Sequence, residues 1–161
     1  MTIRIYGKYA IGLGIAALAA ALFLMNLSVQ EFYGDNVGYA FRSLGYLDYL
    51  GTSFQTQPVD WYAGTDLPWW TRLSFHDHPP LVFLIQNLFF KLFGNSVFSA
   101  RLPAVMFGFI SIFLMYLAVG RPFKSKLLAA LSALAIAFNT GSAAMFRSAL
   151  IEPIQMVFLL L

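Results

Sequence analysis

The sequence predicts an all-α integral membrane protein, a bundle of helices that crosses the bilayer several times. Of its 161 residues, 60% are hydrophobic and only 11% are charged, whereas a soluble domain usually carries about 25% charged residues. Residues 9–28 and 102–119 are uncharged apolar runs, and about 20 such residues cross the ~30 Å hydrocarbon layer as a helix. A small soluble core could not bury this much apolar surface.

The composition also excludes several kinds of site. The chain has no cysteine, which rules out a disulfide framework and cysteine-based zinc binding. Its net charge is +3 and its pI is about 9.3, but the cations do not cluster as nucleic-acid binding requires. We therefore expect no nucleic-acid partner. The positive charge is better explained by topology, because Lys and Arg concentrate in cytoplasmic loops.

The first apolar run, 9–28, follows Arg4 and Lys8 and reads as a retained membrane helix. A cleaved signal peptide is the alternative, but its apolar core usually has about 7–15 residues and ends in a small-x-small site. This run is longer, and "LMNLSVQEFY" contains no such site. We expect the N-terminus to be cytoplasmic.

The next segment, 29–101, is predicted to form an outer loop with two interfacial helices. Residues 35–50 place apolar side chains at helical spacing, with Asp35 in the N-cap position. A helix over 80–93 would reach only about 22 Å, and Gln86 and Lys91 interrupt its apolar face. It is either a short span or a half-immersed helix.

The basic segment "RPFKSK" (121–126) favours the second reading of 80–93. If 9–28 runs outward and 102–119 runs inward, this segment is cytoplasmic, as positive charge prefers, and 80–93 need not cross. Residues 127–145 then return outward. A fourth apolar run starts at 152–161 and is too short to span, so we expect the sequence to be the N-terminal part of a longer polytopic protein.

This topology gathers ionisable side chains at the outer surface, where they become functional candidates. They are Asp35, Arg72, His76, Asp77, His78, Arg101, Arg147 and Glu152.

Each candidate also has an ordinary structural explanation. Asp35 could only cap a helix, and Glu152, which precedes Pro153, could only occupy a first turn. Arg147 and Glu152 could simply pair with each other, and Arg101 could only anchor a helix end. His76 and His78 could hold part of a zinc site, but two ligands are not a site. From these residues alone the function stays open.

The order of three motifs resembles the N-terminal part of a C-type (GT-C) membrane glycosyltransferase, a group that includes protein O-mannosyltransferases and lipid A aminoarabinose transferases. "DNVGYA" (35–40) is similar to the family's "DE-x-x-Y-A". "HDHPPLVFLIQNLFFKLFGNSVFSARLPAVMFG" (76–108) is similar to an "HPPL" loop, an apolar helix ending in "LFG", and an Arg opening the next span. "RSALIEP" (147–153) is similar to "R-x-x-x-x-D-P". The resemblance covers almost the whole chain.

The resemblance implies a GT-C helix bundle that transfers a sugar from a polyprenyl-phosphate carrier to an extracytoplasmic acceptor. Asp35 matches the family's catalytic carboxylate, and Glu152 matches an acidic residue of the active-site cavity. Asp77 falls where the aminoarabinose branch has a glutamate that can contact a metal, and His78 matches the histidine of "HPP". Two departures are Asn36, where the family usually has a second acid, and Glu152, where Asp is commoner.

The chemistry suits these residues. A polyprenyl phosphate is already a good leaving group, so Asp35 as general base would suffice to activate an acceptor hydroxyl, with inversion at the anomeric carbon. Substrate binding is assigned to Arg72, His76, His78, Arg101 and Arg147, and the cations or a divalent metal ion at Asp77 would offset phosphate charge.

The partners expected are the lipid-linked donor, membrane lipids, and an acceptor protein, lipid or glycan in the plasma membrane or cell envelope. The competing hypothesis is a non-enzymatic polytopic protein, either a transporter segment or an assembly subunit. A transporter more often places charges and broken helices near the bilayer midplane, whereas here the charges lie at the outer helix ends.

Overall fold

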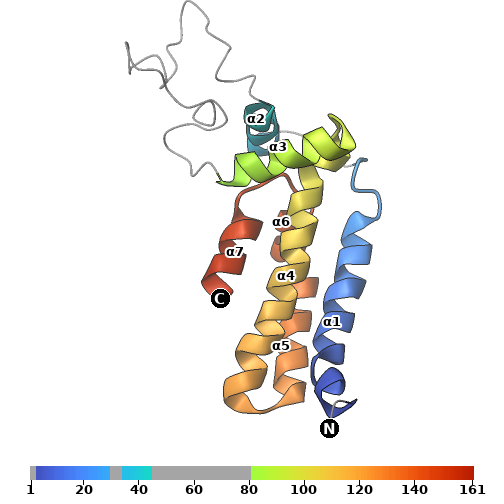
Figure 1. The fold of residues 1–161 in the computed structure, drawn as a ribbon, viewed down its shortest axis with the longest axis vertical. Helices are drawn as coiled ribbons and strands as arrows, with labels where there is room; N and C mark the ends of the chain where they lie inside the picture. The colour runs from blue at the N-terminus through green and yellow to red at the C-terminus, as the bar shows by residue number, and fades with distance from the viewer. Residues whose placement is uncertain (1–2, 30–33, 45–80) are drawn as a thin grey trace, which may run out of the picture.

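The computed structural model describes residues 3–29, 34–44 and 81–161, and within this part every regular element is a helix. The all-helical fold predicted from the sequence is therefore confirmed. Figure 1 shows upright helices capped at one end by two helices that lie across them. In chain order the helices are α1 (Ile3–Leu24), α2 (Asp35–Ser43), α3 (Leu81–Phe93), α4 (Val97–Phe123), α5 (Lys126–Phe138), α6 (Thr140–Phe146) and α7 (Glu152–Leu160).

The core lies around α4, which contacts α1, α3, α5, α6 and α7. Small side chains allow these helices to approach closely: Ala129, Ala133 and Ala137 form a fully buried stripe at four-residue spacing on α5. At Gly108 of α4, an added Cβ would lie 2.7 Å from the ring of Phe146. The bundle is thus held together by close backbone approach, as is usual for helices in a membrane.

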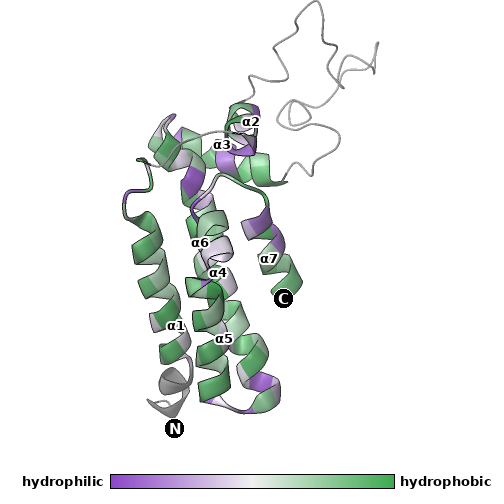
Figure 2. Cartoon of the chain, turned by 180° about the vertical axis from the view of Figure 1, so that it is seen from behind, coloured by the Kyte–Doolittle hydropathy of each residue, from purple (hydrophilic) through white to green (hydrophobic). Residues whose placement is uncertain are grey.

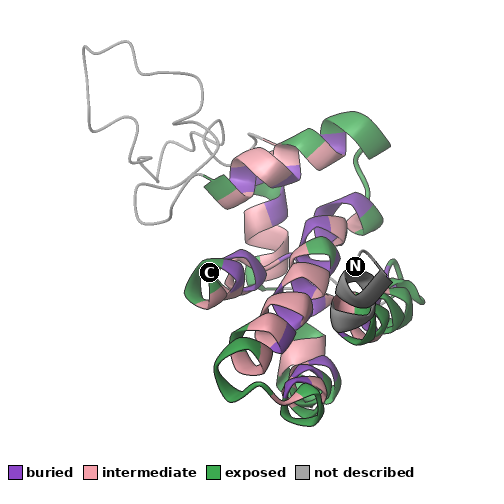
Figure 3. Cartoon of the chain, turned by 60° about the horizontal axis from the view of Figure 1, so that its bottom comes forward, coloured by how far each residue is buried: buried purple, intermediate pink, exposed green. Residues whose placement is uncertain are grey.

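The outside of the bundle is apolar. Large hydrophobic side chains such as Leu18 on α1 (57% exposed) and Leu131 on α5 (52% exposed) face outward, and Figure 3 shows the buried residues gathered on the inner faces of the helices. Figure 2 shows apolar residues along the upright helices, with hydrophilic residues at the two ends. An exposed surface of this kind fits contact with lipid.

Among the described residues, α4 is the helix that is long and apolar enough by itself to cross a membrane. The predicted span over 127–145 is not one straight helix: α5 and α6 meet at a 67° bend. The cause is Asn139, whose side-chain Oδ1 accepts hydrogen bonds from the backbone N–H of Gly141 (3.0 Å) and Ser142 (3.2 Å). This N-cap starts a new helix in a new direction.

The predicted helix over 9–28 also ends early. Helix α1 stops at Leu24, and Asn26 takes a left-handed conformation with φ 54°. Asparagine tolerates this region better than most residues because its short side chain can bond locally. The consequence is a turn that leaves the carbonyl groups of Met25 and Leu27 beyond the helix end, where they need other partners.

The two helices predicted in the outer loop are present in the described part. Helix α3 matches the predicted 80–93 closely and ends at Gly94, where φ is +80° and the N–H donates to Phe90 O (2.9 Å). Helix α2 begins at Asp35 as predicted but ends at Ser43, and residues 45–80 lie outside the described part. Figure 1 shows α3 lying across the end of α4.

Candidate functional site

The candidate site lies at the end of the bundle covered by α2 and α3, which we call the α2 end. It comprises the start of α2, the start of α4, the segment after α1, and residues 147–152. Asp35 is the first residue of α2 and is exposed. The alternative that it caps the helix is wrong: the N-cap is Gly34, with φ 59°, and no side chain caps α2. The Asp35 carboxylate is therefore not used as a cap.

Asn36 attaches the start of α2 to the segment between α6 and α7. Its Oδ1 accepts a 2.6 Å hydrogen bond from the backbone N–H of Ala149. Ala149 is buried with Ala40, Phe90 and Ala100 in a small apolar cluster. The residue that departs from the family's second acid thus has a structural role, and it places Asp35's helix beside the segment that joins Arg147 to Glu152.

We expect Asn36→Ala to loosen α2. A hydrogen bond of this kind contributes about 1 kcal/mol, so amide hydrogen exchange in α2 should become about fivefold faster. Asn36→Asp should retain slow exchange because a carboxylate also accepts. Asn95→Ala, at an exposed residue in the α3–α4 turn, is the matched control; equal exchange rates in the two alanine variants would contradict the role of Asn36.

A polar network fixes the other end of α2. The buried Gln86 of α3 accepts a short hydrogen bond from the Ser43 hydroxyl and donates to Ala100 O at 2.7 Å. Asn87 donates to Ser43 O at 2.7 Å. One side chain of α3 therefore joins α2 to α4. Arg42 is also buried here, with its guanidinium 5.8 Å from the centre of the Phe83 ring.

Two arginines from distant parts of the chain converge on the end of α1. Arg101 Nη1 donates to Leu27 O at 2.7 Å, and Arg147 Nη2 donates to Met25 O at 2.8 Å. Cationic donors suit the carbonyl groups at a helix C-terminus, although the two guanidinium groups repel each other. Arg101 is only 2% exposed, which makes it an anchor of the fold; its substrate-binding role stays a prediction.

Arg147 and Glu152 do not pair in the structure, so that alternative is wrong. Arg147 reaches Met25 instead, and its Nε is buried without a hydrogen-bond partner among the described residues. Glu152 begins α7, with Pro153 next to it in the first turn, as the sequence suggested. The half-buried carboxylate has one oxygen, Oε2, that is buried and has no hydrogen-bond partner within the described ranges.

Glu152 also lines a cavity of about 200 Å³ between α6 and α7, together with Ser142, Phe146 and Gln155. A carboxylate that lines a cavity is suited to accept a hydrogen bond from a ligand hydroxyl group. Glu152 begins α7 and lies just after the segment that Asn36 holds.

Four of the predicted site residues, Arg72, His76, Asp77 and His78, lie outside the described residues. Within the described ranges no three His, Asp or Glu side chains are grouped as metal ligands. The metal prediction at Asp77 therefore stays a prediction. Sequence reasoning did not predict the structural roles of Asn36, Ser43 and Gln86. The signal for Gln86 was its place inside an otherwise apolar helix.

One of three comparisons with known proteins found a match to the chain. The family model of dolichyl-phosphate-mannose-protein mannosyltransferases matches residues 77–161, which includes Arg101, Arg147 and Glu152. No curated protein and no solved structure shows a significant match to the chain. The matched region covers more than half of the chain, from the "HDHPPL" segment to the last helix. The chain therefore belongs to the dolichyl-phosphate-mannose-protein mannosyltransferase family, a family of GT-C-type membrane glycosyltransferases.

Proposed function

We propose that this protein transfers a sugar from a polyprenyl-phosphate carrier to an acceptor on the extracytoplasmic face, with inversion and with Asp35 as general base. The observation that carries the proposal is the Asn36–Ala149 hydrogen bond. It attaches the helix that begins with Asp35 to the segment between Arg147 and Glu152, so that residues more than a hundred positions apart belong to one region, in a chain of this family.

Three described residues, Asp35, Glu152 and Arg147, each have one proposed role in the transfer reaction. Asp35 is exposed at the α2 end and would take the proton from an acceptor hydroxyl as the carbon–oxygen bond forms. Glu152, which lines the cavity between α6 and α7, would hold a sugar hydroxyl. The guanidinium of Arg147 would offset the charge of the departing phosphate, which needs no proton because it is already a stable anion.

The arrangement of the helices supports a multi-pass topology with the site on the extracytoplasmic side. The N-terminus and the basic segment 121–126 lie at one end of the bundle, and the α2 end lies at the other (Figure 1). Positive charge favours the cytoplasm, which leaves the α2 end extracytoplasmic. In this orientation α2 and α3 lie at the outer membrane surface, where a lipid-linked donor presents its headgroup.

The donor class is tested with the full-length protein, of which these 161 residues are expected to be the N-terminal part, purified in lipid nanodiscs. We expect transfer of radiolabelled mannose, or of another sugar, from a polyprenyl-phosphate donor to an acceptor peptide or lipid, and none from the matching nucleotide sugar. The reason is that the proposed site lies at the membrane surface, where a lipid-linked donor presents its headgroup, and that its arginines would bind the single phosphate of that donor. Transfer from the nucleotide sugar without lipid carrier would refute the donor assignment, and binding of the carrier without any transfer would favour the non-enzymatic alternative.

A further inference from the structure

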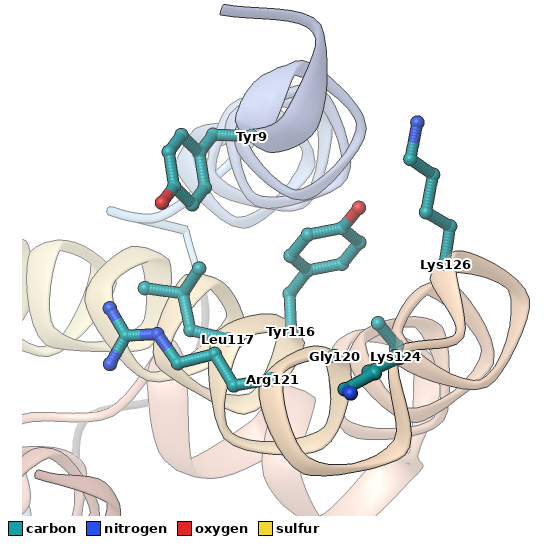
Figure 4. Close-up of a pocket in the computed structure, with 8 residues that line it drawn as sticks. Tyr9, Tyr116, Leu117, Gly120, Arg121, Lys124 and Lys126 are labelled. Carbon is teal, nitrogen blue, oxygen red and sulfur yellow. The ribbon is translucent and has the colours of Figure 1, made fainter. Parts of the chain in front are cut away.

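A second candidate site lies at the opposite end of the bundle, where α4 turns into α5. A cavity of about 690 Å³, which we call the α4–α5 pocket, opens there between α1 and the turn. Figure 4 shows Tyr9 of α1 across from Tyr116 and Leu117 of α4, with Arg121, Lys124 and Lys126 along the turn. This pocket is more than three times the volume of the cavity beside Glu152.

The shape of the pocket follows from two close approaches of the helices. At Gly12, an added Cβ would lie 2.6 Å from the ring of Tyr116, and at Gly120 it would lie 3.2 Å from Cβ of Ala129. These glycines let α1 and α5 press against α4. Lys124 then reverses the chain in a left-handed conformation, with φ 50°.

The charge of the pocket is positive, and no described carboxylate lines it. Arg121, Lys124 and Lys126 are exposed, and the only carboxylates among the described residues, Asp35 and Glu152, belong to the α2 end. Helix α5 also begins here, capped by the Ser125 hydroxyl, which accepts from Leu128 N at 3.2 Å. The positive end of its dipole adds to the attraction for an anion.

The surroundings of the pocket indicate which kind of anion it takes. The pocket lies at the end of α4, the helix long enough to cross the membrane, and its wall combines tyrosine rings with Leu117 and Ala129. Tyrosine is enriched at the level of lipid headgroups, and basic pockets between membrane helices bind anionic headgroups. A soluble anion would gain nothing from the apolar part of this wall.

We propose that the α4–α5 pocket binds the phosphodiester headgroup of an anionic phospholipid from the membrane leaflet opposite the transfer site. The lipid would hold the α4–α5 turn against α1. The binding site is independent of the sugar-transfer chemistry, because none of the pocket residues belongs to the α2 end; the choice of leaflet rests on the topology proposed above.

The test measures lipid binding to the purified full chain by native mass spectrometry, with phosphatidylglycerol, phosphatidylcholine and soluble glycerol phosphate as probes. We expect phosphatidylglycerol to bind at least about tenfold more tightly than phosphatidylcholine, and to weaken as salt is raised. Equal binding of the two lipids would overturn the proposal. Binding of glycerol phosphate as tight as that of phosphatidylglycerol would also overturn it, because the pocket would then be a free-phosphate site.

Variants locate the binding. Arg121→Gln combined with Lys124→Gln should weaken phosphatidylglycerol binding about tenfold or more, whereas Arg121→Lys with Lys124→Arg, which keeps both charges, should bind like the unaltered protein. Lys91→Gln, at an exposed cation on α3, is the control for net charge. Undiminished binding in the double Gln variant, or an equal loss in Lys91→Gln, would place the lipid elsewhere. If the double Gln variant does not fold, the lipid preference and salt response of the unaltered protein still decide the proposal.

Discussion

Asp35→Asn should abolish sugar transfer by the full-length protein, lowering kcat by about 10² to 10⁴-fold, the range that general base catalysis contributes. Asparagine has nearly the same shape as aspartate but cannot take up a proton at neutral pH. The measurement is the rate of transfer from a polyprenyl-phosphate sugar in membranes that contain equal amounts of each protein. Binding of the donor should change little, because the carboxylate is assigned to the acceptor hydroxyl.

At Asp35, a loss of activity can be separated from a loss of stability. Its side chain is exposed and caps no helix, and surface substitutions of this kind usually change stability by no more than about 0.5 kcal/mol. Expression, membrane insertion and the unfolding temperature should therefore match those of the unaltered protein. Asp35→Glu, which keeps a base but moves it, should recover part of the activity. Full activity of Asp35→Asn would remove Asp35 from the mechanism.

Arg101→Ala should cause a large loss of stability, about 3 kcal/mol or more. The substitution leaves the space of a large buried side chain and takes the hydrogen-bond donor from Leu27 O; cavities of this size cost roughly 2–5 kcal/mol and an unpaired buried carbonyl about 1–3 kcal/mol. We expect the thermal unfolding temperature in detergent to fall by several degrees. The segment after α1 should also become more accessible to protease.

Two further variants separate the structural role of Arg101 from a role in substrate binding. Lys91→Ala removes an exposed cation from α3 and should leave the unfolding temperature unchanged. Arg101→Lys keeps the charge but offers a shorter reach to Leu27 O, so it should be partly destabilised. If Arg101→Ala instead unfolded at the unaltered temperature and only raised KM for the donor, the anchoring role would be wrong and the substrate-binding prediction would stand.

Sequence patterns predicted the described helices well where local rules dominate. Helix α3 lies where 80–93 was expected because an apolar run ends at Gly94, which alone takes the required positive φ without strain. The early end of α1 and the bend at Asn139 were harder to foresee. Each depends on a polar side chain or a left-handed residue inside an apolar run, and hydrophobic periodicity does not register either feature.

In the candidate site, too, some features were predictable from the sequence and others were not. Asp35 and Glu152 were predicted as site residues because a charged carboxylate beside a membrane helix costs free energy, which makes it a functional candidate. The partners of these residues were not predictable from sequence. Arg147 could equally have paired with Glu152, and only the packed chain shows it bonded to Met25 O instead. In the sequence, Asn36 was only a departure from the family's second acidic residue, but in the structure its side chain accepts a hydrogen bond from the backbone N–H of Ala149.

Composition and the length of the apolar runs were enough to predict an all-helical membrane protein, because about 20 apolar residues cross a bilayer as a helix and a helix satisfies its own backbone hydrogen bonds there. The motifs of the sequence also indicated the family, and the family match over residues 77–161 confirms it. The tertiary structure decided which backbone carbonyls and amides the polar side chains satisfy. Those pairings join residues that lie 74, 113 and 122 positions apart, and buried polar groups bond to whatever the packed helices bring within reach.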